Sequence, residues 1–169
     1  VTSFLHDFPP LPRNADPVLE ASMKWSNGTI DLSGKADLVV GRPNGRESRR
    51  LIVDFKSGGR SANHRQDLRF YALVETLRSE VPPRKLVTYY LDWSEAEAEP
   101  VTEGILESAL DRTVGAIERY VELTVGKRPP TRTPGPSCRW CPHAATCDEG
   151  RAHLTAMADD GTQGFDDPA

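Results

Sequence analysis

The stretch Leu51-Ile52-Val53-Asp54-Phe55-Lys56-Ser57-Gly58 decides the fold that this chain can adopt. Its first three residues are bulky and apolar, which predicts a strand, and the glycine pair at 58–59 ends that strand. Alternate residues of a strand share one face, so the side chains of Asp54 and Lys56 project together. The sequence therefore predicts a strand that ends on a carboxylate beside an ammonium group.

The neighbouring sequence supplies the rest of a sheet. Strands are predicted at residues 18–26, 29–41, 51–56 and 86–91. The first two are joined by the hairpin signal Ser26-Asn27-Gly28, and a helix between Asn63 and Pro82 provides a crossover to the fourth. Residues 94–100 are expected to form an exposed connection. The fold class is therefore α/β, a central and mainly antiparallel or mixed sheet flanked by helices.

The C-terminal half of the chain is predicted to contain a second helix, at 102–125. One apolar stripe runs along it, formed by Leu106, Leu110, Val114, Ile117 and Val121, and is interpreted as core packing. A proline-rich linker follows. We expect a core at 1–130, a cysteine metal clasp at 131–150 and a disordered, acidic tail at 151–169.

Charge and hydropathy exclude some classes of protein. The formal net charge of −4 argues against a protein that coats nucleic acid by charge alone. Local arginine clusters at 42–50 and 60–69 are either phosphate-binding patches or solvated surface. No run approaches the roughly 20 apolar residues of a membrane span. No signal peptide is evident, so we expect a cytoplasmic protein without membrane contact, and the start at Val1 suggests a processed or truncated chain.

The acidic residues suggest a site for a hard cation. Asp37 comes late in the strand before Asp54, so the two carboxylates can lie close across a strand pair. They would repel one another unless a cation such as Mg²⁺ lay between them. With Lys56 beside it, such a cation suits the hydrolysis of a phosphodiester. The alternative is an ordinary surface ion pair, because an Asp-x-Lys triplet often occurs by chance.

The order of three motifs is more specific than any one of them. The segments Gly34-Lys35-Ala36-Asp37-Leu38-Val39, 51–58 and Asp67-Leu68-Arg69-Phe70-Tyr71-Ala72-Leu73 together resemble the RecB-like branch of the PD-(D/E)XK nuclease superfamily. This resemblance implies a restriction-endonuclease-like core. It also implies that Mg²⁺ or Mn²⁺ is bound by Asp37, Asp54 and Phe55, that Lys56 acts in catalysis, and that DNA is contacted or the site supported by Gln66, Asp67 and Tyr71.

Two departures from the family pattern affect these expectations. Asp67 stands where the family usually has Gln, while Gln66 comes one residue earlier. The family also has an upstream helix with a His or Glu that completes the metal site, for which neither His6 nor Glu20 is a convincing counterpart. That helix lies in missing sequence, or the site works with fewer ligands.

The resemblance implies a metal-dependent deoxyribonuclease, an exonuclease rather than an endonuclease. It would act on single-stranded DNA or DNA ends in repair or recombination, with a helicase or recombination protein as a partner. The alternative is a non-catalytic DNA-binding or scaffold module that keeps the nuclease fold. A metal-clasped interaction protein without a nucleic-acid role is a third interpretation.

The three cysteines form one cluster, Cys138-x2-Cys141-x5-Cys147, whose close spacing predicts a site for a soft metal. Inert or redox-active thiols are the alternative. The cluster resembles that of AddB-type nucleases, which implies a [4Fe-4S] cluster with its fourth ligand outside this chain. A Zn²⁺ site completed by His143 or His153 remains open.

Overall fold

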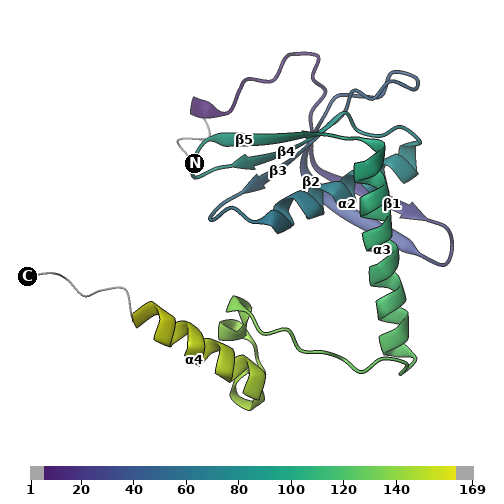
Figure 1. The fold of residues 1–169 in the computed structure, drawn as a ribbon. Helices are drawn as coiled ribbons and strands as arrows, with labels where there is room; N and C mark the ends of the chain where they lie inside the picture. The colour runs from purple at the N-terminus through teal and green to yellow at the C-terminus, as the bar shows by residue number, and fades with distance from the viewer. Residues whose placement is uncertain (1–5, 163–169) are drawn as a thin grey trace, which may run out of the picture. The chain divides into compact units, whose positions relative to one another are not determined.

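The computed structural model of the chain describes residues 6–162, apart from the side chains of Ala62 and of residues 159–162. The chain divides into two compact units, one ending at Glu118 and the other beginning at Arg119. Each unit is described by itself, with the element labels of Figure 1. The sequence predicts the end of the core domain further along the chain, at residue 130.

The first unit contains a five-stranded sheet in the order β1-β2-β3-β4-β5. Its strands are β1 (Val18–Ser26), β2 (Asp31–Val40), β3 (Leu51–Lys56), β4 (Lys85–Tyr90) and β5 (Glu95–Pro100). Neighbouring strands are antiparallel, except β3 and β4, which run parallel and are connected through helix α2 (Ala62–Ser79). The predicted mixed α/β sheet with a crossover helix is confirmed.

Strand β5 was not predicted. Residues 95–99 read Glu-Ala-Glu-Ala-Glu, and their composition suggested an exposed connection because neither residue favours strands. The alternation itself has the period of two that is typical of a strand. β5 pairs with β4 along its whole length and lies at the edge of the sheet, where a row of charges discourages pairing with another chain.

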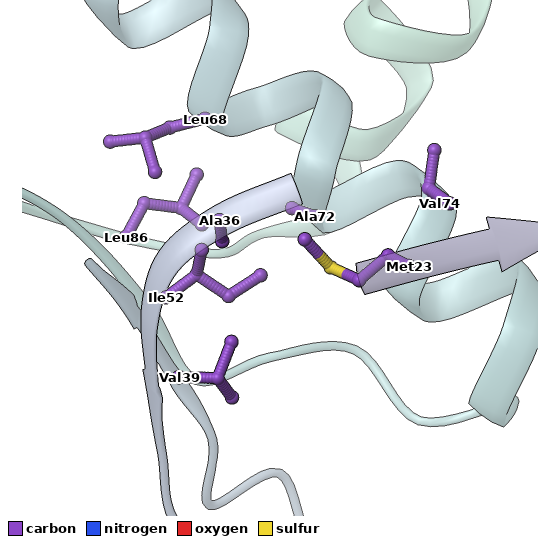
Figure 2. Close-up of a cluster of buried hydrophobic side chains, with 8 residues drawn as sticks. All are labelled: Met23, Ala36, Val39, Ile52, Leu68, Ala72, Val74 and Leu86. Carbon is purple, nitrogen blue, oxygen red and sulfur yellow. The ribbon is translucent and has the colours of Figure 1, made fainter. Parts of the chain in front are cut away.

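A buried apolar cluster lies on each face of the sheet. Helix α2 contacts β1, β2, β3 and β4. Figure 2 shows the cluster between them, which consists of Met23, Ala36, Val39, Ile52, Leu68, Ala72, Val74 and Leu86. A second cluster contains Val53 and Tyr89, against which Phe8 and Phe55 pack. Ile52 and Val53 are adjacent residues of β3, so the two clusters lie on opposite faces of the sheet.

Helix α3 (Glu103–Thr124) corrects one expectation. Ala109 is buried and Leu106 packs against the cluster of Figure 2, but Leu110 and Val114 are 44% and 43% exposed. The interpretation of the apolar stripe as core packing is therefore wrong for these two residues and for Val121, which is 49% exposed. Apolar spacing shows that a helix has an apolar face, but it does not show what covers that face.

The second unit contains the 3-10 helices η1 (Pro136–Trp140) and η2 (Ala144–Thr146) and helix α4 (Asp148–Thr162), which contacts both. The expected disordered tail is wrong for residues 151–162, which belong to α4; residues 163–169 lie outside the described part. Asp148 and Glu149 in the first turn suit the positive end of the helix dipole. No helix among the described residues has the length and apolar character needed to cross a membrane.

Candidate active site

Asp37 and Asp54 lie at the point where the pairing of β2 with β3 ends. The register pairs Leu38 with Val53, so Asp37 and Asp54 occupy the next opposed position. Asp37 Oδ2 accepts a hydrogen bond of 2.7 Å from the backbone N–H of Phe55. The sheet register therefore brings together the two acidic residues that are distant in the sequence.

Asp54 is buried, at 5% exposure, although it carries a carboxylate. Burial raises its pKa, and the nearby ammonium of Lys56 does not fully offset this. Asp54 Oδ2 lies 2.8 Å from Lys56 Nζ; apart from this ion pair, it accepts no hydrogen bond from the residues that the structure describes. A buried carboxylate oxygen with this open capacity fits a hard divalent cation, which would favour the ionised form.

Lys56 is held as a cation. Burial alone lowers its pKa, but the carboxylates of Asp54 and Asp67 raise it by more, so the net shift is upward. A protonated lysine cannot serve as a general base. Its ammonium group is instead suited to donate hydrogen bonds to a phosphate or to an attacking water.

Helix α2 brings two further residues to this group. Asp67 and Tyr71 are four residues apart and share a helix face. Burial raises the pKa of Tyr71, and the negative charges of Asp54 and Asp67 raise it further, so Tyr71 remains a neutral phenol and a hydrogen-bond donor. Gln66 lies about 100° around the helix from Asp67. Of the two candidates, Asp67 therefore occupies the face that Tyr71 shares.

Gly34 has a role that the sequence did not suggest. A Cβ at this position would lie 2.7 Å from Cε1 and 2.8 Å from Cδ1 of Tyr71. The Tyr71 ring therefore rests directly on the backbone of β2, where any side chain would displace it. The glycine that precedes Asp37 in the motif makes room for the tyrosine.

A strained residue lies across from Asp37. Leu19 pairs with Leu38 and Ala21 with Ala36, which places Glu20 opposite Asp37. Glu20 has a φ of 51° and its carboxylate is paired with Lys35. Left-handed backbone is unfavourable for a residue with a Cβ.

The alternation of β2 changes phase at the same point. Ala36 belongs to the cluster beneath α2, whereas Leu38 belongs to the cluster on the opposite face. In a regular strand these two residues would share a face. The irregularity lies at Asp37 and Glu20, so it sets the direction in which the Asp37 carboxylate projects.

The arginine clusters are less available to phosphate than their sequence suggested. Arg60, Arg65 and Arg69 all form ion pairs with the glutamates of β5. Arg69 forms a two-pronged pair with Glu99, which lowers the pKa of Glu99. In the other cluster Arg42 is paired with Asp16, Arg49 with Glu47, and Arg50 with the buried Glu75. Most of this positive charge is therefore neutralised within the protein.

In the second unit, Cys138, Cys141, Cys147 and His143 line one cavity of about 530 Å³. All three thiols are free. Gly150 lies between two of them, because a Cβ on it would be 3.4 Å from Cys147 Sγ and 3.6 Å from Cys138 Sγ. The backbone N–H groups of Gly135 and Gly150 donate to Cys138 Sγ and Cys147 Sγ, each at 3.4 Å. Two of the three sulfur atoms therefore each accept a backbone hydrogen bond.

Neither cluster has the geometry of a complete metal site. Among the described residues, no group of three Cys, His, Asp or Glu side chains gathers closely enough to hold a metal ion. The carboxylate cluster offers two acidic side chains in register, while the thiols share a cavity without converging.

Comparison with known proteins identifies the family. The family model of the PD-(D/E)XK nuclease superfamily matches residues 6–148. This chain therefore belongs to the PD-(D/E)XK nuclease superfamily, and its mixed sheet with flanking helices is consistent with the restriction-endonuclease-like fold.

Among solved structures, the chain is similar to the crystal structure of SSO0001, with a TM-score of 0.46 and 16% sequence identity. The match covers 82% of this chain and 63% of that chain, so this chain spans less than two thirds of its length. No curated protein matches this chain.

Proposed function

We propose that this chain is a Mg²⁺- or Mn²⁺-dependent deoxyribonuclease of single-stranded DNA or DNA ends, an exonuclease rather than an endonuclease. The observation that carries the proposal is the buried Asp54 carboxylate, which lies opposite Asp37 and beside Lys56. Membership of a nuclease superfamily supports the reaction class. A place in cytoplasmic repair or recombination, beside a helicase or recombination protein, extends the same proposal.

Each residue of the site has a role in this proposal. Asp37 and Asp54 would hold the cation, with Phe55 contributing its main-chain carbonyl. A bound divalent cation lowers the pKa of a coordinated water and neutralises negative charge on the phosphate. Lys56, which is protonated, donates hydrogen bonds to a phosphate oxygen or the attacking water. Tyr71 is a neutral donor beside it.

The competing function is a non-catalytic DNA-binding module, and the energetics of Asp54 argue against it. A raised pKa means that the ionised form of Asp54 is disfavoured in the folded protein without a cation. A module without turnover has no need of that unfavourable charge, and a neutral residue of similar shape would be more stable. The buried carboxylate therefore favours the enzyme.

The test compares single-stranded DNA cleavage by the parent with Lys56→Ala and Asp54→Asn, in Mg²⁺, in Mn²⁺ and in EDTA. Asp111→Asn, an exposed carboxylate on α3, is the matched control. We expect metal-dependent cleavage by the parent and the control and loss of cleavage in both site variants. Equal cleavage by all four proteins would remove the site assignment, and binding without cleavage by the parent would favour the non-catalytic module.

We propose that the second unit binds a metal through Cys138, Cys141 and Cys147. A [4Fe-4S] cluster with its fourth ligand outside this chain is the first candidate, and Zn²⁺ is the alternative. The shared cavity and the two N–H groups that donate to sulfur support a site built on sulfur ligands. Anaerobic purification followed by iron and zinc analysis and absorbance near 400 nm distinguishes the two. A protein containing neither metal would contradict the proposal.

A further inference from the structure

The parallel strands β3 and β4 end side by side at the candidate active site. Lys56 pairs with Tyr90 in the register, and the Lys56 carbonyl accepts a 2.9 Å hydrogen bond from the N–H of Leu91. Opposed residues project from the same face of a sheet, so the side chains of Lys56 and Tyr90 are neighbours. The turn that follows Tyr90 therefore begins close to Lys56.

Trp93 follows on the turn after β4 and presents a half-exposed indole. The ring of Tyr90 is buried, whereas Trp93 is 49% exposed, and their ring centroids are 5.9 Å apart at an interplanar angle of 65°. The guanidinium carbon of Arg60 lies 5.2 Å from the Tyr90 ring centroid and 5.8 Å from that of Trp93. These three planar groups form one platform, which we define as Trp93, Arg60 and Tyr90.

The platform is built from two loops that are fixed to one another. The N–H of Gly58, after β3, donates a 2.6 Å hydrogen bond to Asp92 Oδ2, after β4. The N–H of Trp93 also bonds to the carbonyl of Tyr90, at 3.3 Å. The indole is therefore held in place before a ligand arrives, which reduces the entropic cost of binding.

The charge of the platform indicates which part of DNA it contacts. Arg60 is paired with Glu95 and, at 3.2 Å, with Glu97, so its positive charge is neutralised. Glutamates at this position repel phosphates. A neutralised guanidinium beside a half-exposed indole still offers planar surfaces to a nucleobase.

We propose that Trp93 stacks an unpaired base of the DNA strand whose phosphate is bound at Lys56. The inference rests on the proposed nuclease function and specifies its substrate as single-stranded DNA or a frayed end, because a base within a duplex is not free to leave its stack. Adjacent strands are about 4.8 Å apart, and Tyr90, whose ring lies 5.9 Å from that of Trp93, is one strand beyond Lys56. The stacked base therefore belongs to a nucleotide close to the scissile phosphate.

The first experiment measures binding of a short oligothymidine in EDTA, where no strand is cut. We expect Trp93→Ala to weaken binding about 5- to 150-fold, the range for loss of one base–aromatic stack. Trp93→Phe should retain most of the affinity, because it keeps a planar ring. Trp140→Ala, which removes the exposed tryptophan of the second unit, is the matched control and should bind as the parent does.

The second experiment identifies the contacted group. An oligonucleotide with one abasic position near the cleavage site should bind the parent more weakly than the intact strand, and should bind Trp93→Ala no more weakly. The slope of log affinity against log salt should be unchanged in Trp93→Ala, since stacking releases no counterions. A reduced slope, or equal losses for single strands and duplex, would identify a phosphate contact and overturn the proposal.

The outcomes separate this inference from the function on which it rests. If the parent cleaves DNA while Trp93→Ala, Trp93→Phe and Trp140→Ala all bind equally well, the base platform is wrong and the nuclease stands. If the parent neither binds nor cleaves DNA, the proposed function fails first and the platform fails with it. If circular dichroism shows that Trp93→Ala is unfolded, the test uses the parent and Trp93→Phe, each with the intact and the abasic strand. Weaker binding of the abasic strand by both proteins supports the platform, and equal binding of the two strands overturns it.

Discussion

The carboxylate cluster and the thiol cluster show two ways in which a fold places polar side chains close together. Asp37 and Asp54 are held by a strand register that hydrophobic burial on both faces of the sheet determines. The three thiols lie in short 3-10 segments and turns, around a cavity, with few buried apolar neighbours. If both clusters bind metal as proposed, the first is organised by the fold beforehand, whereas the second needs the metal to complete its organisation.

The largest expected effect is on the stability of the second unit, which contains the thiol cluster. If a metal organises the second unit, its removal with a strong chelator, or Cys138→Ser with Cys147→Ser, should melt that unit while the sheet persists. Structural metals contribute on the order of 10 kcal/mol in small sites. Limited proteolysis should then cut within residues 131–162 and leave the first unit intact.

Chelation also removes Mg²⁺, so the two sites need separate readouts. Mg²⁺ added back after chelation should restore DNA cleavage by the first unit without restoring protease resistance to the second. Simultaneous loss of both units on chelation would contradict the idea that the sheet organises its own cluster. Resistance of the cysteine variants to protease would show that no metal supports the second unit.

The second prediction concerns the free energy of unfolding, which the buried carboxylate of Asp54 lowers. In the absence of divalent metal, Asp54→Asn should raise the free energy of unfolding by about 1 kcal/mol, or the melting temperature by about 2–4 °C. It should also lower the rate of DNA cleavage 10²-fold or more, because several kcal/mol of transition-state stabilisation are lost. Added Mg²⁺ should stabilise the parent and leave the variant unchanged, because only the parent retains the ligand.

The pH dependence has a defined sign. Since the pKa of Asp54 is raised above its ordinary value of 3.8, the folded protein binds this proton more tightly than the unfolded chain does. The contribution of Asp54 to metal-free stability therefore falls as the pH rises from 3.8 to the folded pKa, and stays low above it. The difference in melting temperature between the parent and Asp54→Asn should grow over that window. A constant difference across pH would contradict the raised pKa.

Much of the fold followed from the sequence because hydrophobic spacing carries it. The strands around Asp37 and Asp54 and the helix carrying Tyr71 were predicted, and family membership confirms the superfamily suggested by their order. Strand β5 was missed because its alternating residues are Glu and Ala, which have low strand propensity. Residues 151–162 were misread because the acidic, glycine-containing end of the chain suggested disorder, although Ala152, Leu154, Ala156 and Met157 favour a helix.

The candidate site was less predictable wherever a residue contacts an element that is distant in the sequence. The neutralisation of Arg60 could not be foreseen without β5, since its partners are on that strand. The role of Gly34 depends on the ring of Tyr71 from a helix far along the chain. The conformation of Glu20 leaves no local signal, because no Gly or Asn marks its positive φ.

The third prediction tests how Gly34 seats the tyrosine. Gly34→Ala should destabilise the protein by about 1–3 kcal/mol, the usual cost of overpacking, because the new Cβ meets the Tyr71 ring. Tyr71→Ala should relieve this clash, so the double variant should be no less stable than Tyr71→Ala alone. A double-mutant cycle by urea unfolding measures the coupling. Additive effects would mean that the two residues do not contact one another.

The smallest expected effect concerns the backbone of Glu20. Gly is normally less favourable than Ala in a strand by about 0.5–1 kcal/mol. At a left-handed position the order should reverse, because Ala retains the Cβ that makes this conformation unfavourable by about 1–2 kcal/mol. Both Glu20→Gly and Glu20→Ala lose the exposed ion pair with Lys35, so that loss cancels in their comparison.

Urea unfolding should therefore show Glu20→Gly to be more stable than Glu20→Ala by about 1 kcal/mol. If Ala is the more stable, Glu20 adopts ordinary strand conformation in solution, and the change of phase at Asp37 needs another cause. If Gly is the more stable and the affinity for Mg²⁺ is retained, the strain belongs to the backbone turn that aims the Asp37 carboxylate. The carboxylate of Glu20 would then have no part in holding the cation, which leaves Asp37, Asp54 and the Phe55 carbonyl as the proposed ligands from this chain.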